Sequence, residues 1–90
     1  AIFAASDLLA GGAIQALTAR GLRVPDDVAI VGFDDLGSAT GTNPPLTTMH
    51  NPVVSTVKTA TAMLLDLVSG ATPPSKPIIF TPHVVKRDSA

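Results

Sequence analysis

The sequence contains no cysteine, no tryptophan, no tyrosine and only three phenylalanines among its 90 residues. Without cysteine there is neither a disulfide framework nor a thiolate metal site, which fits a reducing compartment. No apolar run approaches the roughly 18–20 residues of a membrane span, so none is predicted. A chain of this length forms one small domain, and its core is limited because so much of it lies near the surface.

Basic residues are also few. There are six lysines and arginines, the formal net charge is −1 and the pI is about 6.0. Only Lys86-Arg87 are adjacent, and we interpret them as a solvated strand end. Phosphate binding needs clustered lysine and arginine, so this segment is not expected to hold nucleic acid by itself.

The amino-terminal residues Ala1–Ala5 are apolar and lack the charged and then apolar pattern of a signal peptide, so none is predicted. A chain that opens on Ala1 and on residues of the buried type is interpreted as a piece of a longer polypeptide. We expect such a piece to associate with further copies or with the rest of its chain, because its sheet edges and apolar faces would otherwise be exposed.

The central feature is the run Val28–Val31, four consecutive apolar residues typical of a strand covered on both faces. Gly32 follows and allows a close approach of another segment to the backbone. Two carboxylates, Asp34 and Asp35, come next. Because open α/β sheets bind ligands beyond the carboxyl ends of their strands, this pattern predicts an acidic pair at the rim of a cleft.

A first helix is predicted over Leu8–Arg20, where proline is absent and alanine and leucine are frequent. Ser6-Asp7 precede it and are of the types that cap helix N-termini. Gly11-Gly12 lie inside it at a cost of about 1 kcal/mol each relative to alanine. They indicate that a sheet, or the same helix of a partner subunit, packs closely against this surface.

A second helix is predicted over Pro52–Ser69, with Asn51 as its N-cap and Pro52 at its first position, where a missing N–H costs nothing. Its apolar residues form one stripe, which we interpret as core rather than as a membrane-surface face. The members of the stripe are Val53, Val57, Ala60, Leu64 and Leu67.

Further strands are predicted at Ile2–Ala5, Leu46–His50, Ile78–Thr81 and His83–Lys86, and Leu36–Pro45 reads as a loop. Pro82 separates the last two strands because it cannot donate to a ladder. The order is strand, helix, strand, strand, helix, strand, strand. This alternation predicts an α/β fold with mostly parallel strands flanked by helices.

An ordered set of motifs along the whole chain resembles the C-terminal part of the LacI/GalR family of bacterial transcription regulators. The motifs are Ser6-Asp7, Ala10–Ala13, Gly21–Asp35, Pro45–Thr48, Asn51-Pro52 and Val85–Ser89. Each piece alone is weak, but their order is specific.

The resemblance implies a fragment of a periplasmic-binding-protein-like (type I) effector domain, built from two α/β subdomains with a sugar or other small metabolite between them. Residues 1–49 would belong mainly to one subdomain, 50–82 mainly to the other, and 83–90 to a return strand and tail. A DNA-binding headpiece normally precedes such a domain, and it is absent from these 90 residues.

The resemblance also implies ligand-binding residues. Asp34 matches the effector-contacting carboxylate of the family, which accepts hydrogen bonds from two sugar hydroxyls or from purine N–H groups. Ser6 matches a small polar position that faces ligand, and Asp7 is the third candidate. The alternative for Asp34 is a turn carboxylate, and for Asp7 an N-cap. Asp35 is interpreted as structural, capping the loop that follows.

The partners implied are a small-molecule effector (a sugar or a purine-like molecule), a homodimer or higher oligomer, and operator DNA through the absent headpiece, with no membrane and a cytoplasmic location. The helix Asp7–Arg20 and the stretch Pro44–Thr48 match regions that build the subunit interface.

No catalytic arrangement can be assembled from the residues, so an enzyme is not expected, and neither a metal nor a cofactor is predicted. His50 and His83 are interpreted as solvated or hinge residues. Two alternatives stay open: a solute-binding protein of the same fold that serves transport, and a phosphoacceptor receiver domain. The receiver domain would need a further aspartate and a lysine at later strand ends, and the sequence lacks them there.

Overall fold

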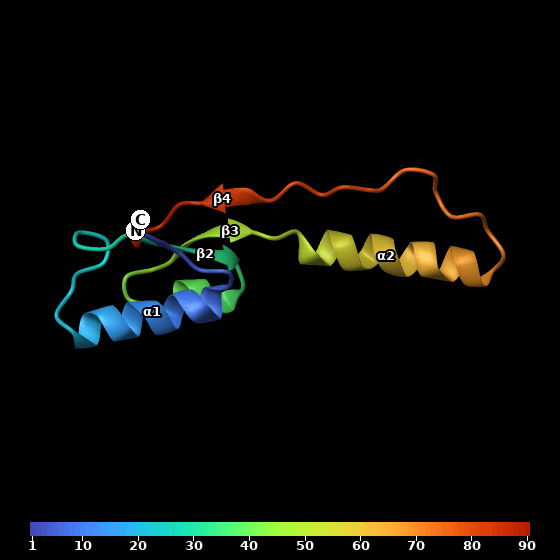
Figure 1. Ribbon diagram of the computed structural model, residues 1–90. Coiled ribbons are helices and arrows are strands. Elements are labelled where there is room, and N and C mark those ends of the chain that lie inside the picture. The colour runs from blue at the N-terminus through green and yellow to red at the C-terminus, as the bar shows by residue number, and fades with distance from the viewer. The chain divides into compact units, whose positions relative to one another are not determined.

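The computed structural model describes residues 1–90 and divides into two compact units, which we describe separately. Unit 1 comprises Ala1–Asn51 and Pro82–Ala90, and unit 2 comprises Pro52–Thr81. Both units are drawn in Figure 1. The elements in chain order are β1 (Ile2–Phe3), α1 (Asp7–Ala19), β2 (Ile30–Asp34), the 3-10 helix η1 (Gly37–Thr40), β3 (Thr47–His50), α2 (Val53–Val68) and β4 (His83–Val85).

Unit 1 is built on a four-stranded sheet with the spatial order β1-β2-β3-β4. The first three strands are parallel, and β4 runs antiparallel to β3. The predicted α/β class with mostly parallel strands is therefore confirmed. Since parallel neighbours β2 and β3 end at the same edge of the sheet, their last residues Asp34 and His50 are register partners.

The central strand lies two residues later than predicted, because Val28 and Ala29 precede it and β2 runs to Asp34. The expectation that both faces are covered is wrong within this chain. Ile30 and Gly32 are buried on the face that α1 covers, whereas Val31 and Phe33 on the other face are only half-buried. Within unit 1, the helix that packs on this sheet is α1, drawn below β2 and β3 in Figure 1.

Helix α1 confirms the prediction to within one residue at each end, and Ser6 is its N-cap. The helix begins there because the Ser6 Oγ accepts a hydrogen bond from the Leu9 N–H, at 3.3 Å. It ends before Gly21, which takes a left-handed φ of 76°. Its buried residues Ala10 and Ile14 join a core of small and aliphatic side chains from the sheet and the η1 segment. The other core members are Ala4, Ile30, Ala39 and Leu46.

Gly32 is a point of close approach between α1 and the sheet, as its position in the sequence predicted. A Cβ built there would lie 2.5 Å from Asp7 Oδ1 and 2.8 Å from Leu46 Cδ2, closer than real Cβ atoms come to other groups. Only glycine fits this position without displacing the side chain of Asp7 or that of Leu46.

The C-terminal tail is hydrogen-bonded to the sheet through Ser89, which is fully buried. The Ser89 Oγ donates to the carbonyl of Ile30 at 2.7 Å and accepts from the N–H of Thr47 at 2.8 Å. The Ile30 N–H donates to the Ser89 carbonyl, also at 2.7 Å. The tail therefore joins β2 to the start of β3, and the residues just before it are held in place.

Unit 2 contains α2 and an extended segment. The N-cap of α2 is Pro52 rather than the predicted Asn51, because Pro52 has a non-helical ψ of 58° while its carbonyl accepts from the Thr56 N–H. The prediction that the apolar stripe of this helix is core is also wrong. Helix α2 has no buried residue, and Val57 and Leu64 of the stripe are 56% and 60% exposed. The physical reason is that unit 2 offers the helix no sheet on which to pack.

The predicted strand Ile78–Thr81 is wrong, because no segment of the chain pairs with it and a strand needs a ladder partner. Ile79 is 80% exposed there. The predicted loop Leu36–Pro45 is confirmed apart from the short helix η1, whose Ala39 enters the core. Neither α1 nor α2 is long and apolar enough to cross a bilayer.

Candidate functional site

The carboxyl edge of the sheet, where β2 and β3 end, gathers most of the polar side chains that the sequence pointed to. Asp34 ends β2, Asp35 follows it and His50 ends β3. In open α/β sheets this edge is where ligands bind. The acidic pair therefore stands at the edge of the sheet that the sequence predicted.

The backbone of this acidic pair is unusual. Asp34 has a φ of 119° and Asp35 a φ of 57°, both on the left-handed side that L-residues seldom adopt. Aspartate tolerates the left-handed helical value of Asp35, whereas the value at Asp34 is rarer. Each sparsely populated conformation costs about 1–3 kcal/mol and persists only when the surroundings hold it. The turn is therefore held by its contacts.

Asp35 makes the strongest of these contacts. Its Oδ1 accepts from Arg87 Nη2 at 2.7 Å, and its Oδ2 lies 3.0 Å from His50 Nδ1. The hydrogen bond from the Arg87 guanidinium, aided by His50, holds the pKa of the Asp35 carboxyl below its usual value, against an opposing effect of burial. The structural role predicted for Asp35 takes this form, an ion pair rather than a loop cap.

Arg87 was interpreted from the sequence as part of a solvated strand end, and that is wrong. It is half-buried, and its side chain is 20% exposed. Besides Asp35 it donates to the carbonyl of Leu46 at 2.9 Å, and its own N–H donates to Thr47 Oγ1 at 2.8 Å. No local signal in the sequence marks this pairing, because 52 positions separate Arg87 from Asp35.

Asp34 differs from its neighbour in that its carboxylate has no hydrogen-bond or ion-pair partner within the chain. It is half-buried, and its carbonyl accepts from the Asn51 N–H at 3.2 Å. A carboxylate that stands at a strand end with both oxygens unused is available to accept hydrogen bonds from a ligand.

Asp7 is nearly inaccessible, with 3% of its surface exposed. Its Oδ1 accepts from Thr48 Oγ1 at 2.5 Å and its Oδ2 accepts from the Leu36 N–H at 3.2 Å. It is the first residue of α1 rather than the N-cap. Since Leu36 follows the acidic pair directly, Asp7 ties the N-terminus of α1 to the same edge of the sheet.

Ser6 therefore also lies at this edge, one residue before Asp7. It is half-buried, and its Oγ is the cap acceptor for α1 described above. A hydroxyl has a second lone pair and its own proton, so this cap bond leaves it able to meet a ligand. The structure thus brings the N-terminus of α1, with Ser6 and Asp7, to the turn that carries Asp34.

His50 and His83 were interpreted as solvated or hinge residues, and they form a pair. They are register partners on β3 and β4, and their ring centroids lie 4.9 Å apart at a tilt of 34°. No group of three or more histidine, aspartate or glutamate side chains is placed to hold a metal ion. The pair is thus a packing contact at the end of β3, next to Asp35.

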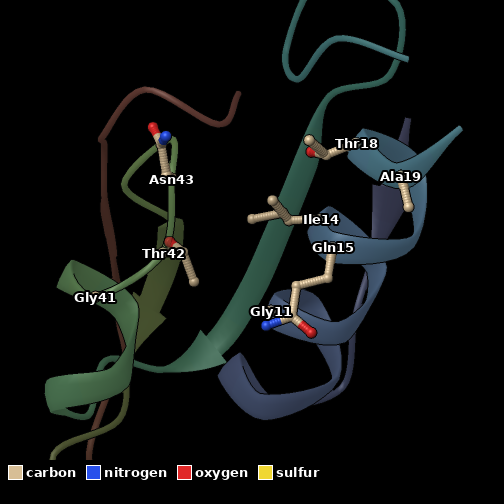
Figure 2. A pocket seen from close by; sticks show the side chains of 8 residues that line it. All are labelled: Gly11, Ile14, Gln15, Thr18, Ala19, Gly41, Thr42 and Asn43. Atoms are coloured by element: carbon tan, nitrogen blue, oxygen red, sulfur yellow. The ribbon is translucent and has the colours of Figure 1, made fainter. Parts of the chain in front are cut away.

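A cavity of about 570 Å³ lies elsewhere in unit 1, between α1 and the segment after η1. Figure 2 shows Ile14, Gln15 and Thr18 of the helix facing Thr42 and Asn43 of that segment. The complete lining is Gly11, Ile14, Gln15, Thr18, Ala19, Gly41, Thr42 and Asn43. It shares no residue with the carboxyl edge and carries no charged side chain, so it is a separate surface.

Comparison with known proteins gives one family over the whole chain. Residues 1–90 match the model of the periplasmic binding protein-like domain. The transcriptional regulator MalR of Streptomyces coelicolor is 43% identical over 89 residues, which are 99% of this chain and 26% of that protein. The chain therefore spans about a quarter of the length of the curated relatives it matches.

Solved structures agree with this assignment. The transcriptional regulator CelR in complex with cellobiose superposes with a TM-score of 0.91 at 37% identity, covering 98% of this chain and 27% of that one. A LacI family regulator from Lactobacillus casei with bound sucrose gives a TM-score of 0.84 at 36% identity, covering 98% and 32%.

Proposed function

Because the chain belongs to the LacI/GalR family of transcription regulators, we propose that it is the effector-sensing and dimerisation segment of such a regulator, with Asp34 as the ligand contact. The observation that carries this proposal is the Asp34 carboxylate, which is unpaired and held in a rare backbone conformation at the carboxyl edge of the sheet. The family consists of regulators, so the chain is not part of an enzyme.

The chemistry of Asp34 suits a polyol. A carboxylate accepts two hydrogen bonds, and neighbouring hydroxyls of a sugar ring supply two donors at matching spacing. Ser6 at the same edge would add a hydroxyl that donates or accepts. Asp7 has both oxygens engaged within the chain, so its part in binding is to hold the turn. Relatives solved with cellobiose and with sucrose support a sugar as the effector.

The dimerisation surface would be the exposed side of α1 together with the segment that leads into β3. Gly12 is exposed and a Cβ added there meets nothing within 4 Å, so nothing inside the chain calls for glycine. Leu8 and Leu9 are 81% and 61% exposed on the first turn. A smooth surface with exposed leucines and the adjoining cavity suits close packing against a second copy.

In the whole protein, effector binding would change the affinity for operator DNA, which is bound through a headpiece outside these 90 residues. The two affinities are then linked, so that each ligand changes the binding of the other by the same factor. A regulator that binds operator DNA would act in the cytoplasm, where that DNA lies.

The test is calorimetric titration of the full-length protein with cellobiose, sucrose and lactose, before and after Asp34→Asn. Removing a charged hydrogen-bond acceptor should weaken binding of the preferred sugar by about 2 kcal/mol, or about 30-fold. Asp26→Asn, which alters an exposed carboxylate of unit 1, is the matched control and should leave the affinity unchanged.

An Asp34→Asn protein with unaltered sugar affinity would remove Asp34 from the site. Sedimentation equilibrium of the same full-length protein tests dimerisation, and a monomer at micromolar concentration contradicts that part of the proposal.

A further inference from the structure

Three consecutive residues at the end of β2 are each held by a different part of unit 1. The Asp34 carbonyl accepts from Asn51 just after β3. The Asp35 carboxylate is held by Arg87 and His50, and the Leu36 N–H donates to Asp7 on α1. These bonds flank the Asp34 side chain, which itself makes none.

Arg87 is held at three points in this group. Its guanidinium spans the Leu46 carbonyl and Asp35, and its main chain is bonded to Thr47. The next residues run to Ser89, which is buried between β2 and β3. A planar guanidinium makes two directed bonds at once, so it fixes the direction of its partner as well as attracting it.

The backbone at the acidic pair needs such a restraint. Two successive residues with positive φ would relax to ordinary conformations if nothing held them. Relaxation at Asp34 would turn its side chain away from its present direction, because that direction follows from φ. The ion pair of Asp35 is the nearest side-chain contact able to prevent this.

We infer that Arg87, acting through Asp35, is a positioning residue that fixes the backbone from which the Asp34 carboxylate meets the effector. This inference rests on the proposed role of Asp34. Two of the Arg87 guanidinium nitrogens donate to protein groups, the Leu46 carbonyl and the Asp35 carboxylate, and it is through the second of these that Arg87 acts on the turn. Its place in the chain, 53 residues after Asp34, gives no hint of this role.

The experiment uses the full-length protein with Arg87→Lys, which keeps the charge but loses the paired bonds. Arg23→Lys is the matched control, because Arg23 also binds an aspartate, Asp27, at 2.7 Å in the same unit. Asp35→Asn is the second variant, should the first fail to fold. Amide hydrogen exchange at Leu36 and Asn51 is measured without ligand, and affinity for cellobiose, sucrose and lactose is measured by calorimetry.

Arg87→Lys should speed exchange at both amides and weaken sugar binding by about 10-fold, since a misdirected Asp34 carboxylate loses about one hydrogen bond to the sugar and such a loss changes affinity by that order. Arg23→Lys should change neither. A purely structural role of Arg87 would lower the melting temperature and leave the affinity of the folded protein unaltered, and a purely electrostatic role would be satisfied by lysine. Either result overturns the inference.

The two proposals fail separately. If Asp34→Asn has no effect or no sugar binds, the proposed function fails, whereas exchange at Leu36 and Asn51 still decides whether Arg87 fixes the turn. If Asp34→Asn weakens binding and Arg87→Lys does not, only the positioning role is lost.

Discussion

The turns at the two ends of β2 are both closed by an arginine–aspartate pair, and they differ in what the pair holds. Before β2, Arg23 and Asp27 are four residues apart, with side chains that are 69% and 31% exposed. They bond through the guanidinium and through the Arg23 N–H. After β2, Arg87 reaches Asp35 across 52 positions from a half-buried place beside β3.

An arginine–aspartate ion pair therefore closes a purely local turn before β2, whereas after β2 it joins segments that are far apart in the sequence. The first turn closes within the six residues Arg23–Val28, since the Asp27 and Val28 N–H groups both donate to the Arg23 carbonyl. These bonds involve no residue outside the turn. The second turn holds an unfavourable backbone, and it forms only when α1, β3 and the tail are in place. A site built this way depends on tertiary packing.

The largest expected effect comes from Gly32→Ala in the middle of β2. The added methyl would push against Asp7 and Leu46, and overpacking of this kind costs about 3 kcal/mol. Because Asp7 holds Leu36, the turn after β2 should loosen, while the turn before β2 should keep its Arg23–Asp27 bonds. Urea unfolding of the full-length protein measures the loss of stability.

Gly37→Ala is the control for Gly32→Ala, because a Cβ there meets nothing within 4 Å. Equal midpoints for the two variants would show that close packing at Gly32 does not hold the second turn.

A smaller effect is expected from removing either arginine. Arg87→Met should lower the free energy of unfolding by about 2 kcal/mol, because it leaves the half-buried Asp35 without its main partner. Arg23→Met should cost clearly less, since the pair it breaks is exposed to water. The two variants are compared by thermal unfolding at pH 7, and losses of the same size would remove the contrast drawn between the turns.

The smallest expected effect is that of pH and salt on the two aspartates of these pairs, Asp27 and Asp35. Hydrogen bonds from Arg23 lower the pKa of Asp27 to about 2, and Arg87 lowers that of Asp35. A carboxyl whose pKa is lower in the folded state stabilises the fold above the unfolded pKa, about 4. That stability is lost as the pH falls through the folded value. For Asp27 the window therefore runs from about pH 4 to pH 2.

Carboxyl carbon NMR titration of the full-length protein at low salt and at 1 M salt checks this. At 1 M the screening length is about 3 Å, so the pKa of the exposed Asp27 should rise more than that of Asp35. A larger rise at Asp35 would mean that its pair with Arg87 is the more open to solvent.

Much of the fold was accessible from the sequence because it follows from local rules. The N-cap and length of α1, the close approach at Gly32 and the strand predicted at Leu46–His50, which the structure has at Thr47–His50, all followed from spacing and residue type. The strand at Ile78–Thr81 and the buried stripe on α2 were wrong, because a strand or an apolar face is completed only by a partner that this segment does not contain.

The candidate site divides in the same way. The sequence by itself determined that an acidic pair ends an aliphatic strand, and its resemblance to a family pointed to Asp34. Only the tertiary structure showed which side chains engage the Asp35 carboxylate and that the Asp34 carboxylate has no partner within the chain. Arg87, His50 and Asp7 reach this edge from elements far apart in the chain. A short sequence motif cannot predict these hydrogen bonds, because they form only when the packing of the fold brings the elements together.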